Sequence, residues 1–199
     1  MTDPSIRPRF DTGSERFLEA LRVAATLHAG QTRKKTHNPY VSHVMGASSI
    51  ATEFGANEDQ AIAALLHDII EDVEPVENAR AAVDWFGTEV LRIVEACTDS
   101  DTHPRPPWHG RKVRYVAHLP EADAAILLVS ASDKLHNARA IVTDLHREGP
   151  TVWLRFTAPR NDTLWYYRGL VSAFRENPNS PTDLVDELDR TVTEMERIA

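Results

Sequence analysis

The stretch AIAALLHDIIED, residues 61–72, decides the fold, because it is apolar on nearly every side of a helix. A helix that is hydrophobic all round belongs in a protein core rather than on its surface. We therefore predict a central helix through this stretch, with Asn57 as its N-cap. Four ionisable side chains interrupt the apolar run: His67, Asp68, Glu71 and Asp72. Buried charges need ion partners, hydrogen bonds or a metal, so these four side chains are candidates for a site.

Helical periodicity continues on both sides of this stretch, and no segment alternates with the two-residue period of a strand. We expect an all-α fold, with residues 1–13 as a flexible N-terminus and residues 14–199 as one compact helical domain. The first helix should start at the cap Ser14 and place Phe17, Leu18, Leu21, Ala25 and His28 on its apolar face. Further helices are predicted from about 42 to 55, between Pro75 and Gly87, from the cap Thr88 to Cys97, and over 111–119, 122–146, 161–174 and 183–198. Residues 99–110, rich in proline, read as a loop, and the amphipathic segment 183–198 should pack back onto the domain.

Composition limits the classes of function. The chain has 199 residues, 42% hydrophobic and 26% charged, as in an ordinary globular protein. A net charge of -8 argues against a nucleic-acid partner, because phosphate backbones are held mainly by clustered lysine and arginine. No run is long and apolar enough for a membrane span or a secretory signal, and Cys97 is the single cysteine. We expect a cytoplasmic protein that acts on a small molecule, without nucleic-acid or membrane partners.

The pair His67–Asp68 offers an imidazole nitrogen beside a carboxylate, which suits a divalent transition metal. On a continuous helix, His67 and Glu71 share one face and Asp68 and Asp72 share a neighbouring one. Two ligands do not complete a metal site, however. From this octet alone, His67 could equally be a hydrogen-bonded core histidine, with Glu71 and Asp72 at the solvated end of the helix.

Two further segments carry polar groups in suggestive patterns. QTRKKTHNPYVSH, residues 31–43, places Arg33, Lys34 and Lys35 in a turn before His43, where they could bind phosphate or simply form a solvated loop. LLVSASDKLHNARAI, residues 127–141, places Asp133 after an apolar run and Asn137 one helical turn later, while Lys134 and His136 should point elsewhere on the helix.

Together these segments resemble a known family. The order H…HD…D, formed by His43, His67–Asp68 and Asp133, is the signature of the HD superfamily of metal-dependent phosphohydrolases. The additional motifs QTRK, PY, HDIIED, Thr98–Asp99 and SDKLHNAR narrow the resemblance to the hydrolase domain of RelA/SpoT-type enzymes and to the stand-alone small alarmone hydrolases. The match runs from about Phe17 to Ile141, and no Walker-type loop or nucleophilic serine or cysteine motif competes with it.

The resemblance implies an enzyme that removes the 3′-pyrophosphate of ppGpp or pppGpp, giving GDP or GTP and pyrophosphate. It implies one divalent ion, typically Mn²⁺. It also implies roles for nine side chains: metal ligands His43, His67, Asp68 and Asp133, water activation by Glu71 and Asp72, and substrate contacts from Arg33, Lys34 and Asn137.

Alternative functions keep the same pocket. The substrate could be another nucleotide, such as ppApp, pApp, NADPH or a nucleoside monophosphate, or the chain could be a non-catalytic nucleotide-binding module. The aromatic residues between Trp153 and Tyr167 could line a base pocket, although packing in the core is the favoured interpretation.

Overall fold

The computed structural model describes residues 8–34, 36–102 and 104–199, and these residues form helices and loops without any strand. The predicted all-α fold is confirmed. Lys35 of the predicted basic turn and His103 of the predicted loop lie outside the described residues. The helices are α1 Glu15–Leu27, α2 Val41–Glu53, α3 Glu58–Leu66, α4 Ile69–Asp72, α5 Val76–Asp84, α6 Thr88–Cys97, α7 Trp108–His118, η1 Leu119–Glu121, α8 Ala124–Glu148, η2 Gly149–Arg155, α9 Arg160–Glu176 and α10 Thr182–Ile198.

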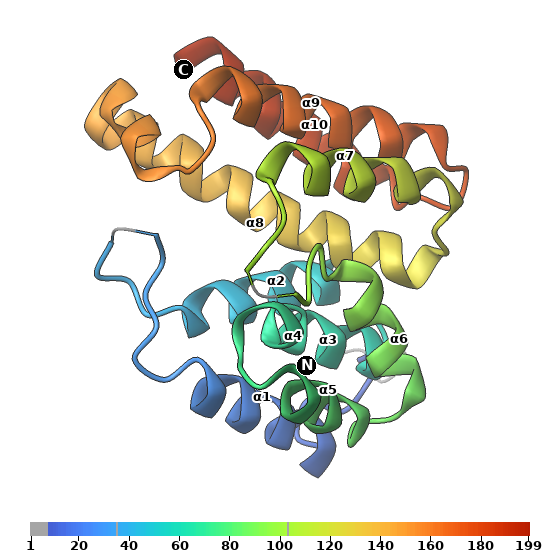
Figure 1. Ribbon diagram of the computed structural model, residues 1–199. Coiled ribbons are helices and arrows are strands. Elements are labelled where there is room, and N and C mark those ends of the chain that lie inside the picture. Colours follow the sequence, from blue (N-terminus) through green and yellow to red (C-terminus); the bar gives the residue numbers. More distant parts are fainter. Residues whose placement is uncertain (1–7, 35, 103) are drawn as a thin grey trace, which may run out of the picture.

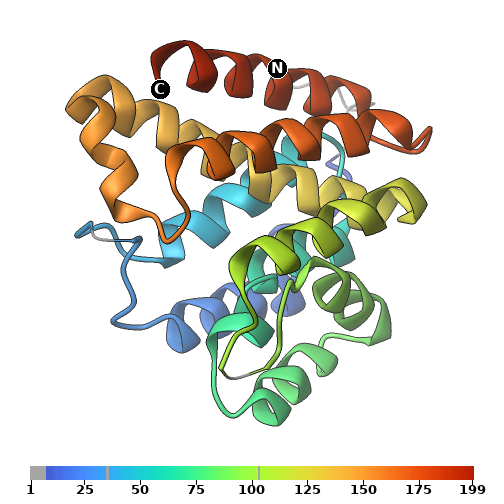
Figure 2. The ribbon, with the colours of Figure 1, turned by 45° about the horizontal axis from the view of Figure 1, so that its top comes forward.

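Helix α8 is the axis of the molecule. It has 25 residues, a length of about 37 Å at 1.5 Å per residue, and it contacts α2, α3 and α6 on one side and α9 and α10 on the other. Figure 1 shows α8 crossing the middle, with α9 and α10 above it and α2 and α3 below. The turned view keeps α9 and α10 side by side (Figure 2). Because α8 is enclosed over most of its length, every residue from Ile126 to Leu135 is buried.

Helix α3 is buried as predicted, since each residue from Ala61 to Leu66 has almost no exposed surface. The expected continuous helix over residues 61–72 is wrong, however, because α3 ends at Leu66 and the short helix α4 begins at Ile69. His67 Nδ1 donates to the carbonyl oxygen of Ala64 at 2.9 Å. In a continuous helix that carbonyl would accept the backbone N–H of Asp68. The side chain of His67 thus competes with the backbone, and the chain turns where the site residues stand.

Two helices begin at their predicted N-caps, Ser14 for α1 and Asn57 for α3. Ser14 Oγ accepts the backbone N–H of Phe17, and Asn57 forms a capping box with Gln60. At α6 the prediction is off by one residue: Gly87, with φ of 108°, is the N-cap, and Thr88 is the first helical residue. Glycine fits there because other residues rarely adopt that backbone conformation. The predicted loop is also shorter, because α7 begins at Trp108.

The apolar face predicted for α1 is partly wrong. Leu18 is 51% exposed and Ala25 is exposed, whereas Ala20, Ala24 and His28 are buried. The buried side is rotated toward the small residues because α1 packs closely on α3. Before α1, the Phe10 ring packs 5.4 Å from the Phe17 ring, centroid to centroid.

The C-terminal helix packs back onto the domain as predicted. Helix α10 contacts both α8 and α9, and its apolar face is buried through Leu184, Val185, Leu188, Val192 and Met195. Within the described ranges, no helix combines the length and apolar character that a membrane crossing requires.

Candidate metal centre and its surroundings

Two histidines and two aspartates from three parts of the fold converge at one buried point. His43 lies on α2, His67 and Asp68 lie in the turn between α3 and α4, and Asp133 lies on α8. His43 Nε2 is 3.4 Å from Asp68 Oδ2 and 3.2 Å from Asp133 Oδ1. His67 Nε2 is 3.1 Å and 3.5 Å from the same two oxygens. The structure therefore gathers all four side chains predicted as metal ligands.

The donor atoms fit a divalent cation. Ligand atoms of His43, His67 and Asp133 lie within 4.8 Å of one another, and all three residues are buried. His67 Nε2 is a buried nitrogen without a hydrogen-bond partner among the described residues, although it faces two carboxylates. Its other ring nitrogen is already engaged with Ala64, so Nε2 is the atom left to bind a ligand. Unpaired buried polar atoms are rare, and a cation at this point would satisfy this one.

The histidines and aspartates at this point shift one another's pKa values. Burial alone would lower the pKa of His67, but Asp68 and Asp133 raise it well above its usual value. Burial likewise works against ionisation of the two aspartates, yet the imidazoles hold the pKa of Asp68 well below its usual value. Lys134 and His67 do the same for Asp133. The carboxylates are therefore negatively charged and attract a positive charge, which a proton or a metal ion can supply.

Lys134 reaches the site, contrary to the prediction that it points elsewhere. Its ammonium group donates to Asp133 Oδ2 and lies 4.6 Å from the centre of the Tyr115 ring. The prediction failed because α8 is surrounded by other helices, so a side chain turned away from the site still meets protein. Burial lowers the pKa of Lys134, but the Asp133 carboxylate raises it well above normal. Lys134 is thus a buried cation paired with a candidate ligand.

Asn137 binds Asp133, and Arg33 binds Asn137 in turn. Asn137 Nδ2 donates to Asp133 Oδ1 at 2.5 Å, and Arg33 Nη2 donates to Asn137 Oδ1 at 2.7 Å. Arg33 is held in place by its turn, in which its backbone N–H donates to the carbonyl oxygen of Asn38 at 2.9 Å. Two of the three residues expected to contact substrate are thus bound to a candidate ligand, Asn137 directly and Arg33 through Asn137.

Tyr40, at the end of the same turn, supports the other aspartate. Its hydroxyl donates to Asp68 Oδ2 at 2.6 Å, and its ring lies between those of His28 and His43, at centroid distances of 4.9 and 5.5 Å. A tyrosine just before the helix of His43 was visible in the sequence as part of the PY motif, but its contact with Asp68 depends on the packing of α2 against α3.

The acidic pair Glu71 and Asp72 lies on α4 beside these residues, and Arg105 binds both members. Its guanidinium group contacts Glu71 Oε1 at 2.9 Å and Asp72 Oδ1 at 2.7 Å, and it also donates to the Glu71 carbonyl. Burial, with Asp68 and Asp99 nearby, raises the pKa of Glu71 to about 7, while Arg105 opposes that rise. Sequence reasoning missed Arg105 because its loop contains no motif that ties it to α4.

More positive charge lies close to this pair. The pKa of Lys34 is lowered by partial desolvation and by the nearby Lys112, which is on α7. Lys112 Nζ lies 5.0 Å from the centre of the Tyr166 ring and donates to Asp99. The side chain of Asp99 is almost fully buried and also accepts from Arg111. Lys34, Arg105 and Lys112 thus lie near Glu71, and Arg105 also pairs with Asp72.

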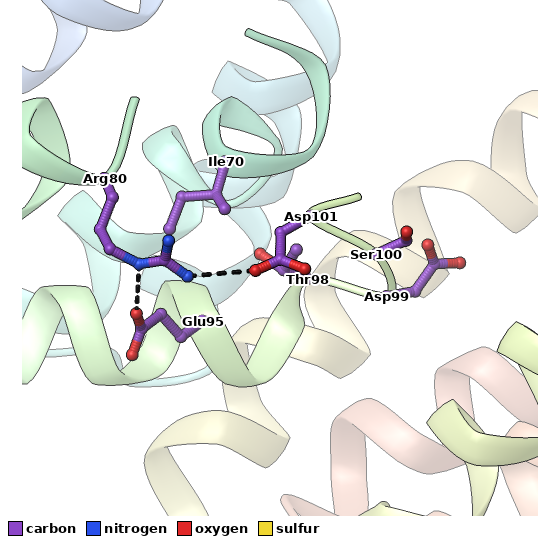
Figure 3. Close-up of a pocket in the computed structure, with 7 residues that line it drawn as sticks. All are labelled: Ile70, Arg80, Glu95, Thr98, Asp99, Ser100 and Asp101. Carbon is purple, nitrogen blue, oxygen red and sulfur yellow. Dashed lines mark hydrogen bonds and ion pairs between the residues drawn. The ribbon is translucent and has the colours of Figure 1, made fainter. Parts of the chain in front are cut away.

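A recess of about 240 Å³ lies behind the loop that carries Arg105. Its polar groups satisfy one another, since Arg80 binds Glu95 at 2.7 Å and Asp101 at 3.3 Å (Figure 3). The carboxylate of Asp99 points away from these three side chains (Figure 3). The residues around the recess therefore fix the loop in place. Asp101 is bound to α5 and Asp99 is bound to α7.

His136 also lies in the site, again contrary to the prediction. Its Nδ1 is 3.0 Å from His43 Nδ1. Burial, together with His43 and Arg33, lowers the pKa of His136 to about 4, so the ring is neutral near pH 7 and keeps one nitrogen lone pair.

The aromatic residues of 153–167 divide between core and surface. Trp153, Tyr166 and Tyr167 are buried, whereas Trp165 is exposed and stacks on His109 with centroids 4.8 Å apart. Phe156 is half-buried, and Lys34 Nζ lies 6.0 Å from its ring centre. Most of these rings pack in the core, as the favoured interpretation held.

Comparison with known proteins agrees with this geometry. The model of the HD domain family matches residues 20–164, so the chain belongs to the HD domain family. Among curated relatives, the chain is 37% identical to guanosine-3′,5′-bis(diphosphate) 3′-pyrophosphohydrolase MESH1 of Mus musculus over 71% of this chain and 76% of that protein. It is 31% identical to the MESH1 protein of Drosophila melanogaster over 89% and 94%.

A solved structure agrees over nearly the whole chain. It is that of a metazoan ortholog of SpoT described as hydrolysing ppGpp, and it superposes with a TM-score of 0.73 at 29% identity, covering 91% of this chain and 96% of that one.

Proposed function

We propose that this chain is a metal-dependent 3′-pyrophosphohydrolase that converts ppGpp and pppGpp to GDP or GTP and pyrophosphate. One observation carries the proposal: two buried imidazoles turn Nε2 toward the carboxylates of the buried Asp133 and the partly buried Asp68, and His67 Nε2 has no other partner among the described residues. The MESH1 relatives, at 31–37% identity, support the choice of substrate. In this proposal His43, His67, Asp68 and Asp133 hold a single divalent ion, and Mn²⁺ is the ion expected.

Hydrolysis adds water across the bond between the ribose 3′-oxygen and the first phosphorus. The water must lose a proton and the 3′-oxygen must gain one. A divalent cation held by His43, His67, Asp68 and Asp133 would supply a Lewis acid for the phosphoryl oxygen and would favour ionisation of the water. Glu71 or Asp72 accepts the proton, and the pKa of Glu71, raised to about 7, suits exchange of protons near neutral pH.

The substrate's remaining negative charge needs cations outside the metal centre. Arg33 and Lys34 are proposed to bind the nucleotide phosphates, and Asn137 is proposed to contact the nucleotide. The proximity of Lys34 to Lys112 and Arg105 supports this proposal, because the repulsion among the cations is relieved when a polyphosphate binds.

The proposal is tested with protein stripped by a chelator and then supplied with Mn²⁺. The expected result is release of pyrophosphate from ppGpp that requires the metal. Orthophosphate as the only product, or equal turnover without metal, contradicts the proposal. Parallel assays with ppApp, pApp, NADPH and a nucleoside monophosphate measure kcat/KM for the other nucleotides. Tight binding of ppGpp without any turnover in the presence of Mn²⁺ would instead identify a binding module.

A further inference from the structure

His136 and His43 meet through the same ring atom. The two Nδ1 atoms are 3.0 Å apart, with ring centroids 4.9 Å apart, and the residues belong to the packed helices α8 and α2. One proton must lie between two nitrogens at this distance, so one ring donates and the other accepts.

The direction of this hydrogen bond follows from the other side of His43. Its Nε2 faces Asp68 and Asp133, so Nε2 is the nitrogen available to a cation. An imidazole that binds a cation through Nε2 carries its proton on Nδ1 and needs an acceptor there. His43 is only 1% exposed, so solvent cannot serve as that acceptor. His136 Nδ1 is the atom in position to accept the hydrogen bond from His43 Nδ1.

The two histidines of the centre are therefore held in the same way by different groups. His67 Nδ1 donates to a backbone carbonyl, that of Ala64. His43 has a side-chain partner instead, and a side chain can be changed by mutation without disturbing the backbone.

Gly46 provides the room for that partner. A Cβ added at Gly46 would lie 2.2 Å from both Cδ2 and Nε2 of His136, so the ring rests directly on the backbone of α2. Glycine inside a helix is less favourable than alanine. Gly46 lies within α2, and close contact with His136 gives that unfavourable residue a structural purpose.

We propose that His136 is a positioning residue that fixes the orientation and tautomer of His43, and that Gly46 is the small residue that allows it to approach. The inference rests on the metal centre of the proposed function.

The test compares two variants of equal size. His136→Asn keeps an acceptor, because Oδ1 of asparagine lies near the place of the histidine Nδ1, whereas His136→Leu has the same shape and no acceptor. Mn²⁺ affinity is measured from the electron paramagnetic resonance signal of free Mn²⁺. We expect His136→Leu to weaken binding by roughly 10- to 100-fold and His136→Asn to restore most of the loss. Thermal denaturation of the metal-free proteins verifies that both variants fold.

Gly46→Ala provides a second, independent route. The added methyl group displaces the His136 ring, so Mn²⁺ binding should weaken as in His136→Leu, and combining the two changes should add little. In protein labelled with ¹⁵N-histidine and loaded with Zn²⁺ as a diamagnetic probe, the parent should show a proton on Nδ1 of His43.

Three results overturn the proposal. They are parent-like Mn²⁺ affinity in His136→Leu, equal weakening in His136→Asn and His136→Leu, and a His43 ring protonated on Nε2 in the Zn²⁺-loaded parent. If the parent protein binds no divalent metal at all, that result contradicts the metal centre and the proposed function together. It is therefore distinguishable from the three results above.

Discussion

Arg105 and Asp72 form an ion pair with 2.7 Å between Nη2 and Oδ1, and the same guanidinium group holds Glu71. The pair joins the loop between α6 and α7 to the short helix α4. Helix α4 has only four residues and little stability of its own, so Arg105 fixes the geometry of the two acids. The two carboxylates are therefore held in a defined orientation beside the metal centre.

The first prediction separates proton transfer from metal binding. Asp72→Asn keeps an Oδ1 acceptor for Arg105 and removes the charge that accepts a proton. We expect kcat to fall by roughly 10² or more while Mn²⁺ affinity and KM change little. Steady-state kinetics and Mn²⁺ titration measure both effects.

The matched control is Asp186→Asn on α10, which also alters an aspartate paired with an arginine, in this case the exposed Arg175. Its kcat should equal that of the parent. Near-normal kcat in Asp72→Asn removes Asp72 from the mechanism, and the same result in Glu71→Gln leaves no role for either acid.

The second prediction concerns pH and Glu71. Its pKa is raised from 4.5 to about 7, so the folded metal-free protein holds a proton that the unfolded chain releases. Stability from this group is present below about pH 4.5 and is lost as pH rises through 7. Relative to Glu71→Gln, the parent should lose roughly 2–3 kcal/mol across this range. Urea unfolding in chelator between about pH 5 and pH 8 measures the difference, and a difference independent of pH would refute the raised pKa.

The third prediction compares the loss of stability when each of two candidate ligands is removed, since only one of them is the counter-charge of a buried lysine. Asp133→Ala removes the partner of the buried Lys134, whereas His67→Ala removes no partner of that lysine. Metal-free Asp133→Ala should be destabilised by about 3–5 kcal/mol, the usual result of leaving a buried charge unpaired, and by more than His67→Ala. Urea unfolding compares them, and adding Lys134→Met should recover much of the loss. Both single variants should also lose metal by elemental analysis, so stoichiometric metal in His67→Ala would identify the wrong site.

The fourth prediction concerns the support of Asp68 by Tyr40. Tyr40→Phe removes the hydroxyl that donates to Asp68 Oδ2, which should cost about 1–3 kcal/mol in the metal-free protein and weaken Mn²⁺ binding several-fold. Tyr166→Phe is the control, because its buried hydroxyl has no hydrogen-bond partner in the described part of the chain. That change should be neutral or stabilising. Equal effects of the two substitutions on Mn²⁺ affinity would show that the Tyr40 hydroxyl does not support the ligand.

Periodicity in the sequence predicted the helical class, and the resemblance to a known family identified the four residues that meet at the centre. The motifs around His43, His67 and Asp133 are local, and each stands at a helix start, a helix end or an apolar run that is visible in the sequence. The interruption after Leu66 was not predictable from periodicity, because it depends on a side-chain hydrogen bond that competes with the backbone. The predicted roles of Glu71, Asp72, Arg33, Lys34 and Asn137 remain proposals.

The residues missed by sequence reasoning share one cause. Lys134, His136 and Arg105 reach the site because other helices or loops close around them, and helical periodicity describes one helix at a time. On a helix packed on most sides, as α8 is, a polar residue turned from the expected face still needs a buried partner. A lysine inside the buried run from Ile126 to Leu135 was the available signal, since lysine is almost never buried without a counter-charge.

The packing of α10 on α8 has a consequence for synthesis. The ribosome makes the segment with His43, His67 and Asp133 before it makes Thr182–Ile198, the helix that covers α8. At about 5–20 residues per second, several seconds pass between the two. During that interval the nascent chain carries its histidines and acids without the helix that buries the back of α8. Stable burial of α8, the helix that carries Asp133, is therefore expected only after α10 has been translated.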